Sequence, residues 1–160
     1  MPEIIKVYKE VFPPLQLIGR MYTNADRNAS GSFSDIWCLW FAEKLFAPLD
    51  EIDNSDYVGA MRVNSGVFEY WIGKLLPVGT EAPEGYSAVE IPGGSFGVCW
   101  ISGKESDSQI YQMDKECVTA MAAQQMYPDG GWFMERYNCP RFTTPNENGE
   151  IILDFLASLK

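Results

Sequence analysis

The feature that most constrains the fold is an order of local patterns that occurs twice along the chain. In each half, a strand-like segment precedes a segment of helical periodicity, and two further strand-like segments follow. Mixed elements in this order predict an α+β domain with an antiparallel sheet and helices packed on one face. At 160 residues, the chain is long enough for one domain with a hydrophobic core. We therefore expect a single domain over residues 1–160, with repeats over about 15–76 and about 85–156.

In the first half, the helix signal follows a polar break. Ser32 and Asp35 have capping-box spacing, and apolar residues follow at helical intervals, so a helix is expected from there to about Phe46. Residues 64–66 have the composition of a hairpin turn. The expected strands are Leu15 to Asn24, Tyr57 to Val63 and Val67 to Leu75.

The second half repeats these signals after the linker-like stretch Pro77 to Gly85. Ser106 and Gln109 show a second capping-box spacing, which predicts that a helix begins there. A turn rich in glycine at residues 128–131 separates this helix from the strands that follow. The expected strands are Tyr86 to Ile91, Ser95 to Ser102, Trp132 to Asn138 and Ile151 to Leu156.

Within the strand Trp132 to Asn138, one carboxylate is surrounded by aromatic residues. Alternation along a strand places Glu135 on the same face as Phe133 and Tyr137. Because an unpaired buried charge costs several kcal/mol, such a residue needs a partner. The partner could be a nearby Lys or Arg, or Glu135 could be exposed on an edge strand. A cationic ligand, held by charge and by the ring faces, is the functional alternative.

Further side chains are candidates for the walls of a ligand pocket around Glu135. Aromatic residues commonly line ligand sites, but they also pack in ordinary cores, and both roles remain open for each of them. A flexible methionine would help a pocket to accept ligands of several shapes. The candidate ligand-binding residues are Glu135, Tyr137, Phe133, Tyr70, Trp71, Trp37, Trp40, Tyr57, Tyr111 and Met113.

The charge balance limits the classes of partner. The net charge is −10, which disfavours binding to the phosphates of nucleic acid and attracts cationic molecules. The first residues lack the pattern of a signal peptide, and no apolar run is long enough to span a bilayer. We expect a cytoplasmic protein without a membrane partner.

Cysteine and histidine content argues against a metal site. The four cysteines contain no CxxC pair, and there is no histidine. We expect free, buried thiols, no metal and no cofactor. The absence of histidine also excludes nucleophile systems that depend on it. The cysteines are Cys38, Cys99, Cys117 and Cys139.

Several short segments, taken together, resemble the GyrI-like family of small-molecule-binding domains, also known as the AraC-type effector-binding domain. The resemblance extends over almost the whole chain, from Leu15 to Leu156. It depends on the order and spacing of the segments. These are Leu39-Trp40-Phe41, Tyr57-Val58-Gly59, Phe68-Glu69-Tyr70-Trp71-Ile72-Gly73, Ile91-Pro92-Gly93-Gly94-Ser95-Phe96, Gly103 and Phe133-Met134-Glu135-Arg136-Tyr137.

This resemblance implies two βαββ repeats related by a pseudo-twofold axis, with a ligand cleft between them. It also implies that Glu135 faces bound ligands, which in relatives are often lipophilic cations such as dyes and drugs. Some members of the family are regulators, gyrase inhibitors or hydrolases, and many are fused to a helix-turn-helix domain. Since this sequence carries no such extension, we expect a stand-alone binder.

Three functions follow as hypotheses. The preferred one is non-catalytic binding of amphipathic or aromatic cations, linked to multidrug sensing or to a regulatory protein partner. An alternative is a small-molecule hydrolase with Glu135 as general base and Tyr70 or Tyr137 stabilising the developing charge, although no complete hydrolase pattern is matched. Another is an acidic inhibitor of a DNA-acting enzyme such as gyrase.

Overall fold

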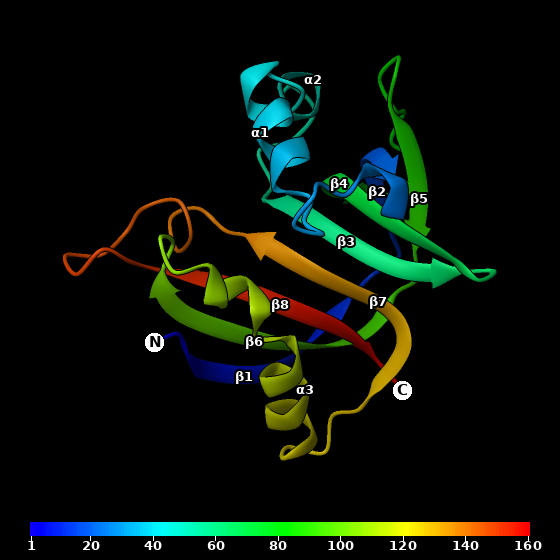
Figure 1. Cartoon of the computed structure of the whole chain (residues 1–160). Helices are drawn as coiled ribbons and strands as arrows, with labels where there is room; N and C mark the ends of the chain where they lie inside the picture. Colours follow the sequence, from blue (N-terminus) through cyan, green and yellow to red (C-terminus); the bar gives the residue numbers. More distant parts are fainter. The chain divides into compact units, whose positions relative to one another are not determined.

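The computed structural model describes residues 1–160 and divides into two compact units. Unit 1 comprises Met1–Pro13 and Gly93–Lys160, and unit 2 comprises Pro14–Pro92. Each unit is built from antiparallel strands and helices, which confirms the α+β class (Figure 1). None of the helices combines the length and the apolar character needed to cross a bilayer.

Unit 2 contains four antiparallel strands in the order β3-β4-β2-β5. The hairpin predicted at residues 64–66 is confirmed, because Ser65 and Gly66 have φ values of 51° and 79° and join two paired strands. The strands are β2 (Leu15–Tyr22), β3 (Tyr57–Asn64), β4 (Val67–Pro77) and β5 (Ser87–Ile91). Between β2 and β3 lie the 3-10 helix η1 (Asn24–Asp26), α1 (Ser34–Ala42) and α2 (Ala47–Asp50).

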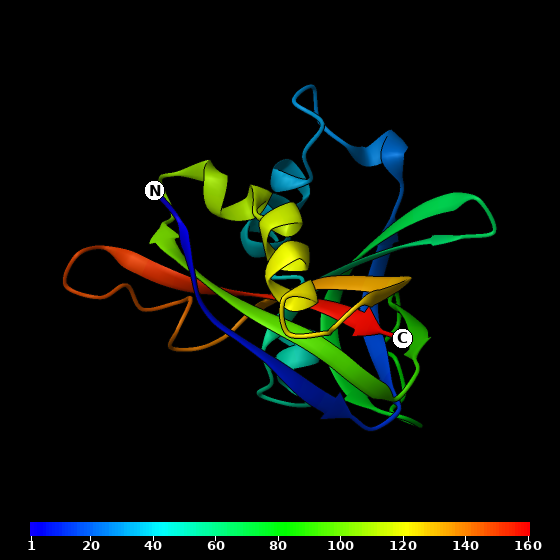
Figure 2. The same cartoon turned by 90° about the horizontal axis from the view of Figure 1, so that it is seen from below.

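Unit 1 contains four antiparallel strands in the order β1-β6-β8-β7. Helix α3 (Asp114–Ala122) packs on one face of these strands through Cys117 and Met121 (Figure 2). It follows the 3-10 helix η2 (Ser108–Gln112). The strands are β1 (Glu3–Phe12), β6 (Gly94–Lys104), β7 (Pro128–Tyr137) and β8 (Glu150–Leu159).

The two units have the same internal arrangement. In each, a strand is followed by helices and then by two strands: β2, β3 and β4 in unit 2, and β6, β7 and β8 in unit 1. Each unit also adds an edge strand beside the first strand of its repeat, β5 beside β2 and β1 beside β6. The sequence indicated the repeated order but not the edge pairing. The segment Tyr86 to Ile91 was expected in the second repeat, yet β5 pairs within unit 2, and no strand was expected at β1.

The predicted capping boxes do not form, although α1 begins within two residues of Ser32. The hydroxyl of Ser32 accepts a hydrogen bond from the amide of Ser34 at 3.0 Å, and α1 has no side-chain cap. A serine or aspartate that binds the amide two residues ahead forms a local turn, and its sequence looks like that of a helix cap.

The second predicted helix start shows the same effect. The carboxylate of Asp107 accepts from the amide of Gln109 at 3.1 Å and caps only the 3-10 helix η2. The α-helix α3 begins at Asp114, eight residues after Ser106. The first helix also ends earlier than expected, at Ala42, since Lys44 adopts a φ of 55°.

Strand β4 is buried on both faces, as its aromatic residues predicted. Tyr70 and Ile72 belong to the core beneath the helices of unit 2, while Trp71 is buried on the other face. The strand also approaches β2 closely at Gly73. A Cβ atom at this position would lie 2.0 Å from the carbonyl oxygen of Ile18, so only glycine fits.

All four cysteines are free thiols, as expected. Burial was expected for them as well. It holds for Cys99 and Cys117, while Cys38 and Cys139 are exposed.

Candidate ligand-binding site

Glu135 lies in β7 on the face of unit 1 that α3 covers. Its strand neighbours on this face, Phe133 and Tyr137, pack against the core formed by α3 and the sheet. Across the sheet, Glu135 pairs with Phe155 of β8. The carboxylate is partly buried. A polar side chain therefore interrupts an otherwise apolar surface.

The carboxylate of Glu135 has a hydrogen-bond donor but no cation beside it. The phenol of Tyr137 donates to Glu135 Oε1 at 3.1 Å. No Lys or Arg nitrogen lies within 4.0 Å of its oxygens, and the ion pairs of the protein all involve other carboxylates. The structural explanation of Glu135 as one half of a salt bridge is thus not observed.

The surroundings of Glu135 favour its neutral form. Burial raises the pKa of the carboxyl to about 7, and the negative charge of Asp114 acts in the same direction. The hydrogen bond from Tyr137 opposes this rise because it stabilises the carboxylate. A positive charge placed next to the carboxyl would lower its pKa and release the proton.

Two further predicted residues belong to the same region of unit 1. Tyr111 in η2 is 40% exposed, and burial raises the pKa of its phenol to about 12, with contributions from the charges of Glu105 and Glu135. Met113, the N-cap residue of α3, packs against the core that also contacts Phe133 and Tyr137. The five predicted residues of this region thus supply one carboxyl, two phenols, a phenyl ring and a thioether.

Three predicted residues gather in unit 2, on the face of its sheet that carries α1. The indole N–H of Trp37 donates to the hydroxyl of Tyr70 at 2.8 Å. Tyr57 stacks on Phe46 with ring centroids 3.7 Å apart, and its hydroxyl donates to Asp50 at 3.0 Å. Burial, together with this bond to Asp50, raises the pKa of Tyr57 to about 12.

Two predicted tryptophans do not have the placement expected of pocket walls. Trp40 is 0% exposed, and its indole N–H donates to the hydroxyl of Tyr22 at 2.8 Å, so no part of the ring is open to a ligand. Trp71 points to the opposite face of β4 from Tyr70, and its indole donates to Glu69 at 2.9 Å. Because side chains alternate along a strand, Tyr70 and Trp71 cannot line the same surface.

Asp114 also belongs to the Glu135 region, although its sequence position did not indicate this. Its charge reaches Glu135 because it is the first residue of α3. The only sequence signal was its place directly after Met113, and the helix was expected to begin at Ser106. Acidic residues are common in the first turn of helices, so this position alone indicates no site.

No family model and no curated protein matches the chain. Its fold is nevertheless similar to that of solved structures. SAV2435, solved bound to tetraphenylphosphonium, superposes with a TM-score of 0.73 and 16% identity, over 98% of this chain and 94% of that chain. A Staphylococcus aureus MU50 protein assigned to bacterial transcription regulation has a TM-score of 0.66 and 17% identity, over 98% and 99% of the two chains.

The chain has the GyrI-like fold. A hydrolase from Listeria innocua is also similar, with a TM-score of 0.56 and 8% identity, over 97% of this chain and 92% of that chain. A protein solved with a bound cation, a protein assigned to transcription regulation and a hydrolase are therefore all similar to this chain in fold. At such identities the likeness concerns the fold, and the function has to be argued from the side chains.

Proposed function

We propose that this protein binds lipophilic or aromatic organic cations, with Glu135 as the counter-charge. The observation that supports this is a partly buried carboxyl between Phe133 and Tyr137 that has no cationic partner within the protein. Ring faces attract cations by roughly 0.5–2 kcal/mol per contact, and the carboxylate adds charge complementarity. The tetraphenylphosphonium bound to SAV2435 is a ligand of this chemical class.

Delocalised cations suit the site better than small ammonium ions. They lose less hydration when they enter a partly buried site, and their apolar surface contacts the rings. Flat rings and one charge specify little about ligand shape, so selectivity is broad. We propose multidrug sensing, linked to a regulatory protein partner, as the biological role; the likeness to the Staphylococcus aureus transcription protein supports it.

The residues around Glu135 are the proposed walls of the site. Tyr111, Met113, Phe133 and Tyr137 supply them from unit 1. Ligand contact by Tyr70, Trp37 and Tyr57 of unit 2 stays a prediction from the sequence.

Replacement of Glu135 by glutamine is the central test. Glutamine keeps the size and removes the charge, so the affinity for tetraphenylphosphonium is expected to fall at least about tenfold, since interactions with charged groups contribute on the order of 1.5–3 kcal/mol. The affinity for neutral triphenylphosphine oxide is expected to stay the same. Quenching of the five tryptophans measures both.

The matched control for this test is Glu147→Gln, which removes the same charge from an exposed position in unit 1. This variant is expected to bind both compounds like the unmodified protein. If E135Q lost affinity for the cation and for the neutral compound equally, Glu135 would act through packing, and the proposal would be contradicted.

Cation binding is expected to depend on pH because the ligand needs the charged carboxylate. With a pKa of about 7 in the free protein, Glu135 is mostly neutral at pH 6 and mostly charged at pH 8. The affinity for tetraphenylphosphonium should therefore be about tenfold weaker at pH 6 than at pH 8. Titrations over this range measure the effect. In E135Q the affinity should be the same at both pH values, and a pH dependence that persists there would assign the effect to another group.

A hydrolase is the second candidate function. The raised pKa of Glu135 favours it, because a general base works best with a pKa near the working pH. Tyr137 lies within hydrogen-bond distance of Glu135 and could stabilise developing charge. Turnover distinguishes the two functions: product formed from an electrophilic small molecule at substoichiometric protein supports the hydrolase, and saturable binding without consumption supports the binding protein.

A further inference from the structure

A cation of the protein itself lies on an aromatic surface in unit 2. Arg27 follows η1, and the centre of its guanidinium is 4.7 Å from the ring centroid of Phe33 and 4.8 Å from that of Phe68. The two rings are nearly parallel, at 17°, with centroids 6.3 Å apart. We call the rings of Phe33 and Phe68 the aromatic platform. Phe33 in turn stacks on Tyr70 with centroids 4.2 Å apart, which holds the platform in place.

Arg27 has no acidic partner, although the protein contains 22 Asp and Glu residues. Its Nε donates to the side-chain oxygen of Asn24 at 2.8 Å, and its Nη1 donates to the carbonyl of Gly31 at 2.8 Å. Both acceptors are neutral. The positive charge of Arg27 is therefore stabilised by the faces of the platform rings and not by a carboxylate.

The loop that carries Arg27 has its own hydrogen bonds. Thr23 and Asp26 form a capping box around η1. The side-chain oxygen of Asn28 accepts from the amides of Ser30 and Ser32, each at 3.0 Å. Because these bonds do not involve the guanidinium, the loop can keep its path when the Arg27 side chain leaves the platform.

We propose that the aromatic platform is a second cation-binding site, which Arg27 occupies in the free protein and which a planar organic cation such as an aryl guanidinium takes in its place. The site consists of unit 2 residues and does not include Glu135. A planar aryl cation offers the same charge as Arg27 and adds a ring that stacks on the platform. Arg27 competes from within the chain, at an effective concentration in the mM range for a short tether. A ligand that binds the platform weakly therefore does not displace Arg27.

Removal of the competing side chain is the test. Arg27→Met keeps an apolar stem and removes the charge, and the experiment is made with E135Q as the background protein. Phenylguanidinium is the probe, and phenylurea is its neutral analogue of the same shape. Calorimetry is expected to show phenylguanidinium binding about tenfold more tightly to R27M/E135Q than to E135Q. The ring proton resonances of Phe33 and Phe68 are expected to shift on binding.

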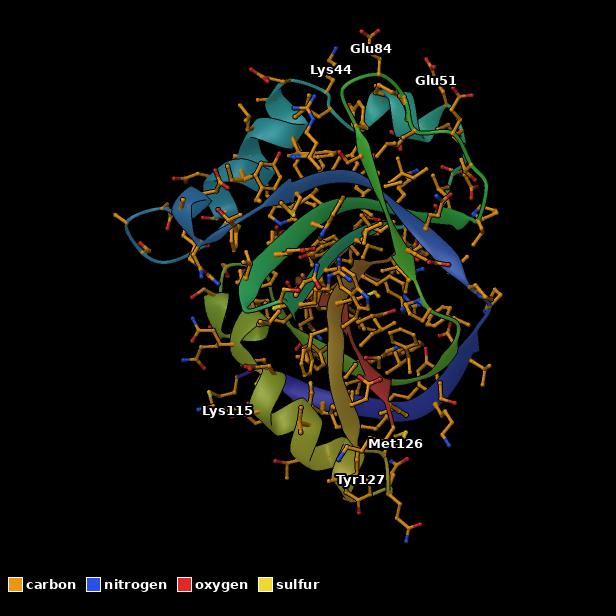
Figure 3. All side chains as sticks on the ribbon, turned by 90° about the vertical axis from the view of Figure 1, so that its right-hand side faces the viewer. Lys44, Glu51, Glu84, Lys115, Met126 and Tyr127 are labelled. Atoms are coloured by element: carbon orange, nitrogen blue, oxygen red, sulfur yellow. The ribbon has the colours of Figure 1, made fainter.

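Two controls make this result specific. Lys44→Met removes an exposed cation elsewhere in unit 2 and should leave the affinity unchanged (Figure 3). Phe68→Leu removes half of the platform and should cancel the gain seen in R27M. Since Glu135 is replaced throughout, the outcome does not depend on whether Glu135 itself binds cations.

Several outcomes would overturn the proposal. An unchanged affinity in R27M/E135Q would show that Arg27 does not compete with the ligand. An equal gain for phenylurea would show that only an apolar patch was uncovered. If R27M does not fold, Arg27→Lys decides by the same titration: its ammonium stacks less well on rings, so a smaller gain is expected, and no gain counts against the proposal.

Discussion

Replacement of Asp154 by alanine is expected to lower the free energy of unfolding by about 3–5 kcal/mol. Asp154 in β8 is 0% exposed and accepts from Arg136 Nε at 2.9 Å and from Arg141 Nε at 3.3 Å. Burial lowers the pKa of Arg136, but the bonds and charges of Glu10 and Asp154 outweigh this and raise it. Without Asp154, Arg141 would lose its ion pair, and the largely buried Arg136 would keep only Glu10, at 3.3 Å.

Urea unfolding followed by circular dichroism measures this loss. Glu147→Ala is the control, because this exposed acid makes no such contacts and should change stability by less than about 0.5 kcal/mol. Arg136 follows Glu135 in β7, so their side chains point to opposite faces of the sheet. Because Asp154 pairs with Arg136, it stabilises the face opposite the candidate site. A loss below about 1 kcal/mol in D154A would mean that the pairs contribute little beyond their desolvation cost.

Replacement of Trp40 by alanine is expected to cost about 3–5 kcal/mol, as for other large aromatic residues removed from cores. The ring is 0% exposed and packs against Phe46 with centroids 4.6 Å apart. Truncation would leave a cavity and would also remove the donor that serves the hydroxyl of Tyr22. Thermal and urea unfolding measure the loss.

Trp40→Phe separates a core role from a ligand role. Phenylalanine keeps one six-membered aromatic ring and loses the pyrrole ring with its N–H, so the stability loss should be smaller than in W40A. The affinity for tetraphenylphosphonium is expected to stay unchanged, because the ring has no exposed surface. A large loss of affinity for tetraphenylphosphonium in a W40F protein of near-normal stability would show that Trp40 does take part in ligand binding.

The sequence predicted local features best where one short-range rule decides the structure. The hairpin between β3 and β4 was predicted because a turn composition separates two strand-like runs. The shared face of Phe133, Glu135 and Tyr137 was predicted because alternation in a strand is fixed by backbone geometry. In unit 1, Met113, Phe133 and Tyr137 pack against the same core, and ligand contact by them stays a prediction.

Other features could not be predicted, because they depend on residues far apart in the chain. The edge strands β1 and β5 are defined by their pairing with β6 and β2, and their own sequences do not indicate these partners. The roles of Trp37 and Trp40, one turn apart in α1, differ only because Trp40 is enclosed by the core of unit 2. Whether a Lys or Arg pairs with Glu135 likewise depends on side chains from distant parts of the chain, so the sequence left this open.

The sequence by itself determined the class of fold, the repeated order of strands and helices, and the face on which Glu135 lies, since periodicity and turn chemistry act over a few residues. Only the tertiary structure decided that no cation of the protein neutralises Glu135, that Trp40 is core, and that Arg27 covers the platform rings. Charge compensation and burial are set by long-range packing, which local patterns do not encode.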